Sequence, residues 1–532
     1  YAISEAAEGY TEEKTRSAVK ALMDLAPKIA LVRREGREVE IPVEEVTVGD
    51  IFIVKPGQAA PTDGVVIAGV SGVDQSPVTG ESAPVDKAPG DVLFAGSING
   101  EGVLEVRANK DFANNTISRI IQMVEEAQER KGQSQRFIER FGARYSPLVL
   151  LVGALVALLP PLFFDGDWTT WITRATIFIV AAAPCALVIS IPITLVAALG
   201  TGARQGVLIK GGVYVEELAR VKVIALDKTG TLTTGKAKVS DVAVEAALSK
   251  ERLLQLAASV ENRSQHPLAQ AIVSYTKAQN IQLPEARDFR SLTGAGVTAQ
   301  VEGKRITVAS PNFFAAALNG NKPLQQQIEV WQEAGKTVIL VSEESAGILG
   351  LIAIQDAIRP NARRAIQSLR AQGAAKVVML TGDNNRTAQA IAAELGIDEV
   401  YAALKPADKA AMVRQLTAEY GHTAMVGDGV NDAPALAEAS VGVAMGAAGT
   451  DVALETADVA LMADDLEKLA YALKLSRRTQ TIVNQNLILA TIVISVLVIG
   501  ALGGFFTLPI AVLGHEISEF IVIGNGLRML RA

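Results

Sequence analysis

Four apolar stretches, each of about 20 residues, set the strongest limit on how this chain folds. They run over Tyr145–Phe164, from about Ala175 to Gly200, from about Leu487 to Phe506 and from about Leu508 to Leu530. Because a helix of roughly 20 apolar residues is long enough to cross a bilayer, each stretch predicts a transmembrane helix. A buried core helix is the alternative. It has most weight for the fourth stretch, which carries His515, Glu516 and Glu519.

Composition supports membrane spans that alternate with ordinary globular domains. Of the 532 residues, 49% are hydrophobic and 20% are charged, and a chain of this length is too long for a single core. The net charge of −7 provides no global basic surface, so we expect no nucleic-acid partner. The one cysteine, Cys185, excludes a disulfide within the chain and suggests that the soluble parts face a reducing compartment.

Basic residues orient the four stretches as two hairpins. Lys and Arg cluster before the first stretch, after the second, before the third and after the fourth, whereas one short connection carries Asp165 and Asp167 and the other carries no charge. An excess of Lys and Arg marks the cytoplasmic side of a membrane. We therefore expect an integral protein of the plasma (inner) membrane with its large segments in the cytoplasm. The chain opens at Tyr1 without Met or a signal-peptide pattern, which leads us to expect further sequence upstream.

The soluble sequence divides into three regions. Residues 30–110 are rich in Val, Ile and Gly in short alternating runs, which predicts a small β domain. A doubly wound α/β pattern begins at the buried strand Val221–Leu226 and resumes near Ile352 with alternating strands and helices. Residues 236–350, with Gly-punctuated strands, are interpreted as an insertion within it.

The strongest chemical signal is the run Asp227-Lys228-Thr229-Gly230-Thr231-Leu232-Thr233, in which an apolar strand ends at an Asp. Ligands of α/β sheets bind at the carboxyl ends of the strands, and a carboxylate there can attack a phosphoryl group and form an acyl phosphate. A second strand leads into Thr381-Gly382-Asp383, and a third leads into a loop with Asp428 and Asp432. Taken singly, each of these Asp residues would more often cap a helix or turn.

Hard oxygen ligands such as Asp428 and Asp432 suit Mg²⁺, and Lys405 is a candidate for neutralising charge on a moving phosphoryl group. These segments resemble the haloacid-dehalogenase-like core of P-type ATPases. The resemblance implies that Asp227 is the phosphorylated nucleophile in an Asp-Lys-Thr run that includes Lys228. It also implies that Thr229 and Asp428 help to hold Mg²⁺ with support from Asp432, and that phosphate is contacted by Thr381, Gly382, Asp383 and Lys405.

Two further motifs agree with this resemblance. The loop Thr79-Gly80-Glu81, an ordinary turn when taken alone, resembles the P-type actuator loop that drives dephosphorylation, with Glu81 as the base or orienter of water. In the insertion, a lone His-Pro is usually a loop corner. Together with nearby residues it resembles the nucleotide-binding domain of the heavy-metal branch, which implies that ATP is bound by Glu261, His266, Gly294 and Gly296.

The second apolar stretch contains Ala183-Pro184-Cys185. Proline inside a helix frees a backbone carbonyl, which a membrane tolerates where the carbonyl lines a site. A simple kink is the alternative. In the fourth stretch His515 and Glu519 share a helix face, and Glu516 is adjacent. Ionisable groups inside a membrane are functional candidates. A thiolate, an imidazole and one or two carboxylates suit borderline divalent metals.

This triplet resembles that of the heavy-metal (type IB) P-type pumps, and the His-Glu pair resembles their cobalt/zinc-type subgroup, usually paired with Ser-Pro-Cys. Ala183 departs from that pattern, as does the continuation Ile517-Ser518-Glu519. The third stretch has no Lys and the fourth no Asp, which disfavours the zinc/cadmium/lead subgroup. We interpret Asn484, Gln485 and Asn486 as helix caps rather than entry-site ligands.

The expected function is ATP-driven export of a divalent transition metal (cobalt, zinc, cadmium, nickel or iron(II)) through an aspartyl phosphate, with Mg²⁺ and ATP, by a monomer in a lipid membrane. A copper(I) exporter, a membrane-tethered aspartyl-phosphate phosphatase and a non-catalytic metal sensor are the alternatives. The expected fold is multidomain α/β plus a helical membrane domain. Its parts are an upstream helix end or linker (1–27), actuator domain (28–112), linker helix (113–144), first transmembrane pair (145–214), phosphorylation domain (215–235 and 351–470), inserted α+β nucleotide-binding domain (236–350) and last transmembrane pair (471–532).

Overall fold

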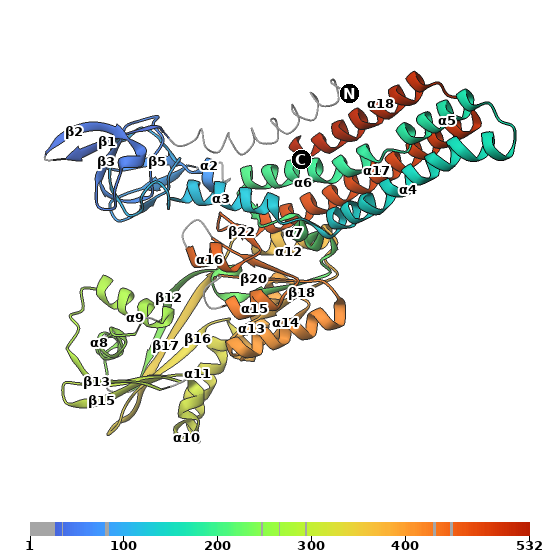
Figure 1. The fold of residues 1–532 in the computed structure, drawn as a ribbon. Coiled ribbons are helices and arrows are strands. Elements are labelled where there is room, and N and C mark those ends of the chain that lie inside the picture. Colours follow the sequence, from blue (N-terminus) through green and yellow to red (C-terminus); the bar gives the residue numbers. More distant parts are fainter. Residues whose placement is uncertain are drawn as a thin grey trace. The chain divides into compact units, whose positions relative to one another are not determined.

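The computed structural model describes residues 27–34, 36–79, 84–245, 248–264, 266–292, 295–428, 432–446 and 451–531. The helix expected within residues 1–27 therefore lies almost wholly outside the described residues. The chain forms two compact units: the first comprises Tyr1–Val221 and Gly446–Ala532, and the second comprises Lys222–Met445. Figure 1 labels their elements.

A small β domain begins the first unit, as residues 30–110 predict. A six-stranded sheet has the order β2-β1-β3-β9-β4-β7, and a three-stranded sheet has the order β6-β5-β8. Inward-facing Val32, Phe52 and Leu104 are fully buried in its core. The strands are β1 (Ile29–Arg34), β2 (Arg37–Pro42), β3 (Ile51–Val54), β4 (Gly64–Ala68), β5 (Ser71–Asp74), β6 (Val85–Lys87), β7 (Val92–Leu93), β8 (Ile98–Asn99) and β9 (Leu104–Ala108).

Long apolar helices form the rest of the first unit, and in the described part of the chain four candidate membrane spans are found. They are α4 (Gln133–Phe163), α5 (Trp168–Ala181) continued by α6 (Cys185–Arg204), α17 (Glu467–Gly503) and α18 (Leu508–Leu527). These helices lie side by side in Figure 1. The second span starts at Trp168, earlier than the expected Ala175, and Pro184 separates two helices instead of kinking one.

The structure corrects the interpretation of Asn484, Gln485 and Asn486 as helix caps, because α17 runs through them. Asn486 is fully buried. Its side-chain amide donates to the carbonyl of Val522 on α18 (3.2 Å), and its Oδ1 accepts from Asn525 (2.8 Å). Sequence spacing alone did not show this pairing between helices.

The start of α4 is fixed by a buried carboxylate from α7 (Gly212–Arg220). The side chain of Glu216 accepts backbone N–H groups of Gln133 (2.9 Å) and Ser134 (3.0 Å). These are two of the N–H groups that a helix start leaves without an internal partner. A negative charge at this end also complements the helix dipole. Beside α7, β10 (Val207–Ile209) pairs antiparallel with β22 (Val459–Leu461).

The second unit contains a run of parallel strands in the order β21-β20-β11-β18-β19. The alternating strands and helices confirm the doubly wound pattern, and hydrophobic strands such as β11 are buried along their whole length. The strands are β11 (Val223–Asp227), β18 (Lys376–Leu380), β19 (Glu399–Tyr401), β20 (Thr423–Gly427) and β21 (Val441–Ala444). The helices between them are α12 (Ala362–Ala371), α13 (Asn385–Leu395), α14 (Pro406–Tyr420) and α15 (Ala433–Glu438).

Two long strands, β12 (Thr233–Val244) and β17 (Gly347–Ile358), lead into and out of the insertion, visible in Figure 1. They belong to an antiparallel sheet of order β12-β17-β16-β15-β14-β13. Alternate residues of β16 and β17 enter two separate cores, one with α8 and α9 and one with α10 and α11. Remaining bounds are β13 (Ala286–Leu292), β14 (Gly296–Val301), β15 (Lys304–Ala309), β16 (Thr337–Glu343), α8 (Lys250–Glu261), α9 (Pro267–Ala278), α10 (Ala315–Leu318) and α11 (Lys322–Glu333).

Candidate functional site

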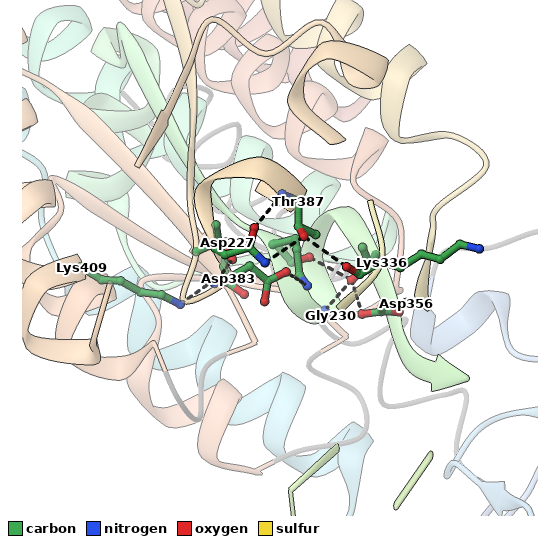
Figure 2. A network of polar contacts seen from close by, with 11 residues as sticks. Asp227, Gly230, Lys336, Asp356, Asp383, Thr387 and Lys409 are labelled. Carbon is green, nitrogen blue, oxygen red and sulfur yellow. Dashed lines mark hydrogen bonds and ion pairs between the residues drawn. The ribbon is translucent and has the colours of Figure 1, made fainter. Parts of the chain in front are cut away.

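Asp227 ends the central strand β11 and is buried among charged partners. The ammonium of Lys409, one turn into α14, donates to Oδ1 of Asp227 (2.6 Å) and to Oδ1 of Asp432 (2.8 Å). Figure 2 shows Lys409 pointing at Asp227. The carboxyl ends of β11, β18 and β20 thus bring together the residues that the sequence selected, as expected where parallel strands share one edge.

The loop after Asp227 is held by Asp356 and Arg359, which lie where the chain returns from the insertion. Gly230 has φ of +75°, a left-handed conformation that glycine adopts without steric cost. The guanidinium of Arg359 donates to the carbonyls of Gly230 (2.7 Å) and Thr231 (2.9 Å). The hydroxyl of Thr233 donates to Asp356 at 2.5 Å, near the end of β17 (Figure 2). Arg359 and Asp356 were not selected from the sequence, because nothing near them in the chain marks their contacts with this loop.

The loop after β18 contributes the next polar residues. Thr381 is buried, and its hydroxyl accepts the backbone N–H of Asp383 (3.1 Å). The carboxylate of Asp383 in turn pairs with the ammonium of Lys228. Gly382 is exposed at this turn. The predicted residues Lys228, Thr381 and Asp383 therefore lie next to one another, beside Asp227.

Electrostatics around Asp227 favour a bound cation. Burial raises the pKa of Asp227 to about 7, and the negative charge of Asp432 acts in the same direction. Burial works against the charge of Lys409, but the two carboxylates outweigh it and raise its pKa. The negative charge of Asp428 also acts to raise the pKa of Asp227. A set of hard oxygen donors with excess negative charge fits Mg²⁺.

The structure places Lys409, rather than the predicted Lys405, against Asp227. Lys405 is exposed at the N-cap of α14, where its backbone N–H donates to Asp408 (3.0 Å). Lys409, one turn later on the same helix face, reaches the strand ends instead. Both lysines belong to the same five-residue run, so the pattern identified the segment but not the residue.

A pocket in the insertion gathers three of the four predicted nucleotide-binding residues. It encloses about 360 Å³ and is lined by Glu261, His266 and Gly296, while Gly294 lies outside the described residues. Burial raises the pKa of Glu261 to about 7. A Cβ at Gly296 would come within 2.1 Å of the carbonyl oxygen of Val308, so the close approach of β14 and β15 requires glycine.

The actuator motif is described only at its first residue. Thr79 ends the short helix α2 (Ser76–Thr79), is buried and donates its hydroxyl to the carbonyl of Gln75 (3.1 Å). Gly80 and Glu81 lie outside the described residues, so the proposed role of Glu81 stays a prediction.

Three potential metal ligands meet within the membrane helices of the first unit. Ligand atoms of Cys185, His515 and Glu519 all lie within 4.8 Å of one another, and Nε2 of His515 is 3.2 Å from a carboxylate oxygen of Glu519. Cys185 is the first residue of α6, directly after the break at Pro184. Glu516, predicted as a fourth ligand, is half-buried and is not part of this cluster.

Comparisons with known proteins match the same domains of this chain. The family model of the haloacid dehalogenase-like hydrolases matches residues 221–440, and that of the P-type ATPase actuator domain matches residues 24–125. A probable cadmium-transporting ATPase of Alkalihalophilus pseudofirmus is 46% identical over 100% of this chain and 74% of its own length. The chain belongs to the heavy-metal-transporting, type IB branch of the P-type ATPases.

Other relatives of this pump agree. A cadmium-transporting ATPase of Staphylococcus aureus is 43% identical over the whole chain and 74% of the relative. The crystal structure of a zinc-transporting PIB-type ATPase in the E2.Pi state superposes with a TM-score of 0.59 at 40% identity, covering 99% of this chain and 85% of that one. The family predicted from the motifs, the membrane location and ATP-driven transport of a divalent heavy metal are thereby confirmed, whereas the His-Glu subgroup remains a prediction.

Proposed function

We propose that this pump exports a divalent transition metal that binds to Cys185, His515 and Glu519. The convergence of these three ligand atoms within 4.8 Å carries the proposal. Buried ionisable side chains are costly within a membrane and are retained at transport sites. The break between α5 and α6 positions the sulfur of Cys185 opposite the inward face of α18.

The proposed chemistry starts at Asp227. Its carboxylate attacks the γ-phosphorus of ATP, the bond to the ADP oxygen breaks, and an aspartyl phosphate forms. Lys409 offsets negative charge at the reacting oxygens, while Lys228 and Asp383 order the neighbouring loop. Thr381 and Gly382 are the further proposed phosphate contacts.

Mg²⁺, when bound, would neutralise phosphate charge. Its proposed ligands are Asp227, Thr229 and Asp428, with Asp432 in support. Water then hydrolyses the acyl phosphate, and we assign Glu81, within the loop of Thr79 and Gly80, to orient that water. ATP is proposed to enter the pocket of Glu261, His266 and Gly296, with Gly294 beside it.

The ligand set favours zinc, cadmium or cobalt among divalent cations. One thiolate, one imidazole and one carboxylate suit borderline metals, whereas copper(I) favours soft sulfur ligands, and Cys185 is the chain's only cysteine. Relatives named for cadmium and a structural neighbour named for zinc support this choice, against the sequence argument that disfavoured the zinc/cadmium/lead subgroup. We also propose that the pump acts as a monomer in the plasma membrane.

ATPase activity in lipid, measured across divalent metals and copper(I), tests this proposal. We expect zinc, cadmium or cobalt to stimulate the wild type and to have no effect on Asp227→Asn or Cys185→Ala. The neighbouring variant Glu516→Ala tests the fourth predicted ligand. Stimulation by copper(I) alone would refute the ligand assignment. Phosphate release without any dependence on metal or Cys185 would favour the phosphatase alternative.

A further inference from the structure

An apolar groove lies on the membrane part of the first unit, where α4, α6 and α17 meet. It encloses about 460 Å³, a volume within the range of roughly 300–1,000 Å³ typical of ligand pockets. Its walls include Phe137, Phe141 and Tyr145 from α4, Leu187 from α6, and Leu487 and Ile494 from α17. The groove is therefore suited to an aliphatic chain.

A second hollow, of about 370 Å³, continues from the first. It shares Phe137, Phe141 and Tyr145 and adds the guanidinium groups of Arg140 and Arg144. The three aromatic rings are stacked along α4, with centroids 6.5 Å apart for Phe137 and Phe141 and 5.0 Å apart for Phe141 and Tyr145. One continuous surface thus changes from apolar to cationic within about two turns of a helix.

The charge at this surface is not balanced by the protein in the described part of the chain. There, neither Arg140 nor Arg144 forms an ion pair with a carboxylate, and Arg140 uses its Nε to donate to the carbonyl of Arg136 (3.2 Å). By contrast, Lys131 is paired with Glu139 (2.6 Å). Both arginines are exposed and lie toward the N-terminal end of α4, where basic residues mark the cytoplasmic side.

We propose that this surface binds an anionic phospholipid of the cytoplasmic leaflet. Arg140 and Arg144 would hold the phosphate by charge-assisted hydrogen bonds, and an acyl chain would lie in the groove of Phe137, Phe141 and Ile494. Basic pockets between transmembrane helices on the cytoplasmic side are suited to such headgroups. A zwitterionic lipid offers the same phosphate, but its headgroup ammonium offsets the negative charge that attracts the two arginines. A free phosphate ion satisfies only the cationic half of the surface.

The site also borders the transport machinery. Pro184, which separates α5 from α6, lines the apolar groove, and the next residue is Cys185. A lipid chain in the groove therefore fills space directly beside the helix break.

Nanodiscs of phosphatidylcholine and phosphatidylglycerol in equal amounts test the proposal, with bound lipid counted by native mass spectrometry. We expect the wild type to retain phosphatidylglycerol preferentially. Arg140→Gln/Arg144→Gln should weaken that retention roughly tenfold or more, because two lipid-facing charges are lost. Arg528→Gln, which removes an exposed arginine at the end of α18, is the matched control and should retain the lipid.

A second variant tests the acyl-chain half. Ile494→Trp narrows the groove and should reduce phosphatidylglycerol retention, while glycerol phosphate added in solution should not displace the lipid. Equal retention of the two lipids by the wild type, or equal loss in Arg528→Gln and in the double variant, would overturn the proposal. Displacement by glycerol phosphate would reduce the surface to a phosphate site and would likewise overturn it.

Discussion

At the scale of single residues, Lys409 is the cation on which the phosphorylation site depends. It is the ammonium shared by Asp227 and Asp432, so Lys409→Ala leaves two buried carboxylates facing each other. We expect phosphoenzyme formation from ATP to slow by about 10²–10³-fold, as for loss of one preorganised charge-stabilising group. Lys405→Ala should stay within about twofold of the wild type, the usual effect of an exposed substitution. Rapid-quench labelling with radioactive ATP distinguishes the two lysines, and equal defects would contradict the assignment.

Glu261 makes stability depend on pH. Burial raises its pKa from 4.5 to about 7, so the folded protein binds this proton more tightly than the unfolded chain does. The stability that this tighter proton binding contributes is thus fully present below about pH 4.5 and is lost as the pH rises through 7. Glu261→Gln should therefore stabilise the protein at pH 8, by on the order of 2 kcal/mol, and have little effect at pH 5.

Thermal unfolding of wild type and Glu261→Gln, measured at intervals from pH 5 to pH 8, checks this expectation. Glu285→Gln is the matched control, because that side chain is exposed and should give no pH-dependent difference. A constant offset between wild type and Glu261→Gln at every pH would show that the carboxyl does not titrate on folding in this range.

The sequence located the reactive residues where they follow a recognisable strand end. Asp227, Thr381 and Asp428 each come directly after a buried run, and parallel strands bring such ends together. Arg359 and Asp356 could not be found in this way, because their contacts with the loop after Asp227 span more than 120 residues of sequence. Their roles depend on how β17 returns from the insertion.

At the scale of elements, hydropathy predicted the membrane helices but not their ends. The first span, expected from Tyr145, is continuous with a helix that begins at Gln133, within the expected linker helix (113–144). Its polar first turns are fixed by Glu216, a partner remote in sequence. The second span begins at Trp168, where Asp167 caps the helix by accepting the N–H of Thr170 (2.8 Å). Such boundaries follow from capping contacts that an apolar window does not detect.

Pro184 is the residue that separates α5 from α6, and its replacement tests what the break contributes. Pro184→Ala restores a backbone N–H and lets one helix continue, which would turn Cys185 away from His515 and Glu519. We expect the metal concentration for half-maximal ATPase stimulation to rise roughly 10–100-fold, as when a ligand loses the group that orients it. Pro192→Ala, inside α6, is the control and should leave that concentration nearly unchanged. An equal shift in both variants would show that the break does not position the ligand.

At the scale of the whole molecule, the metal cluster and the phosphorylation site belong to different compact units, which the chain joins at Val221–Lys222 and Met445–Gly446. Transport requires that metal bound in one unit controls the reactivity of Asp227 in the other, a coupling between two distinct sites. The free energy for that coupling comes from metal binding. The coupling should therefore be lost when the metal ligands are removed, even though the catalytic unit stays intact.

Glu519→Gln and His515→Gln provide the test of this coupling. We expect both to abolish phosphorylation of Asp227 by ATP that is stimulated by the transported metal. Phosphorylation by inorganic phosphate, the reverse of the hydrolysis step, should persist without the transported metal. Asp227→Asn should lose both reactions, and Glu516→Gln, which removes the same charge outside the cluster, should affect the ATP reaction less than Glu519→Gln does. Loss of both reactions in Glu519→Gln and His515→Gln would instead mean that these side chains maintain the fold. Phosphorylation by ATP that remains metal-stimulated in them would place the transport site elsewhere.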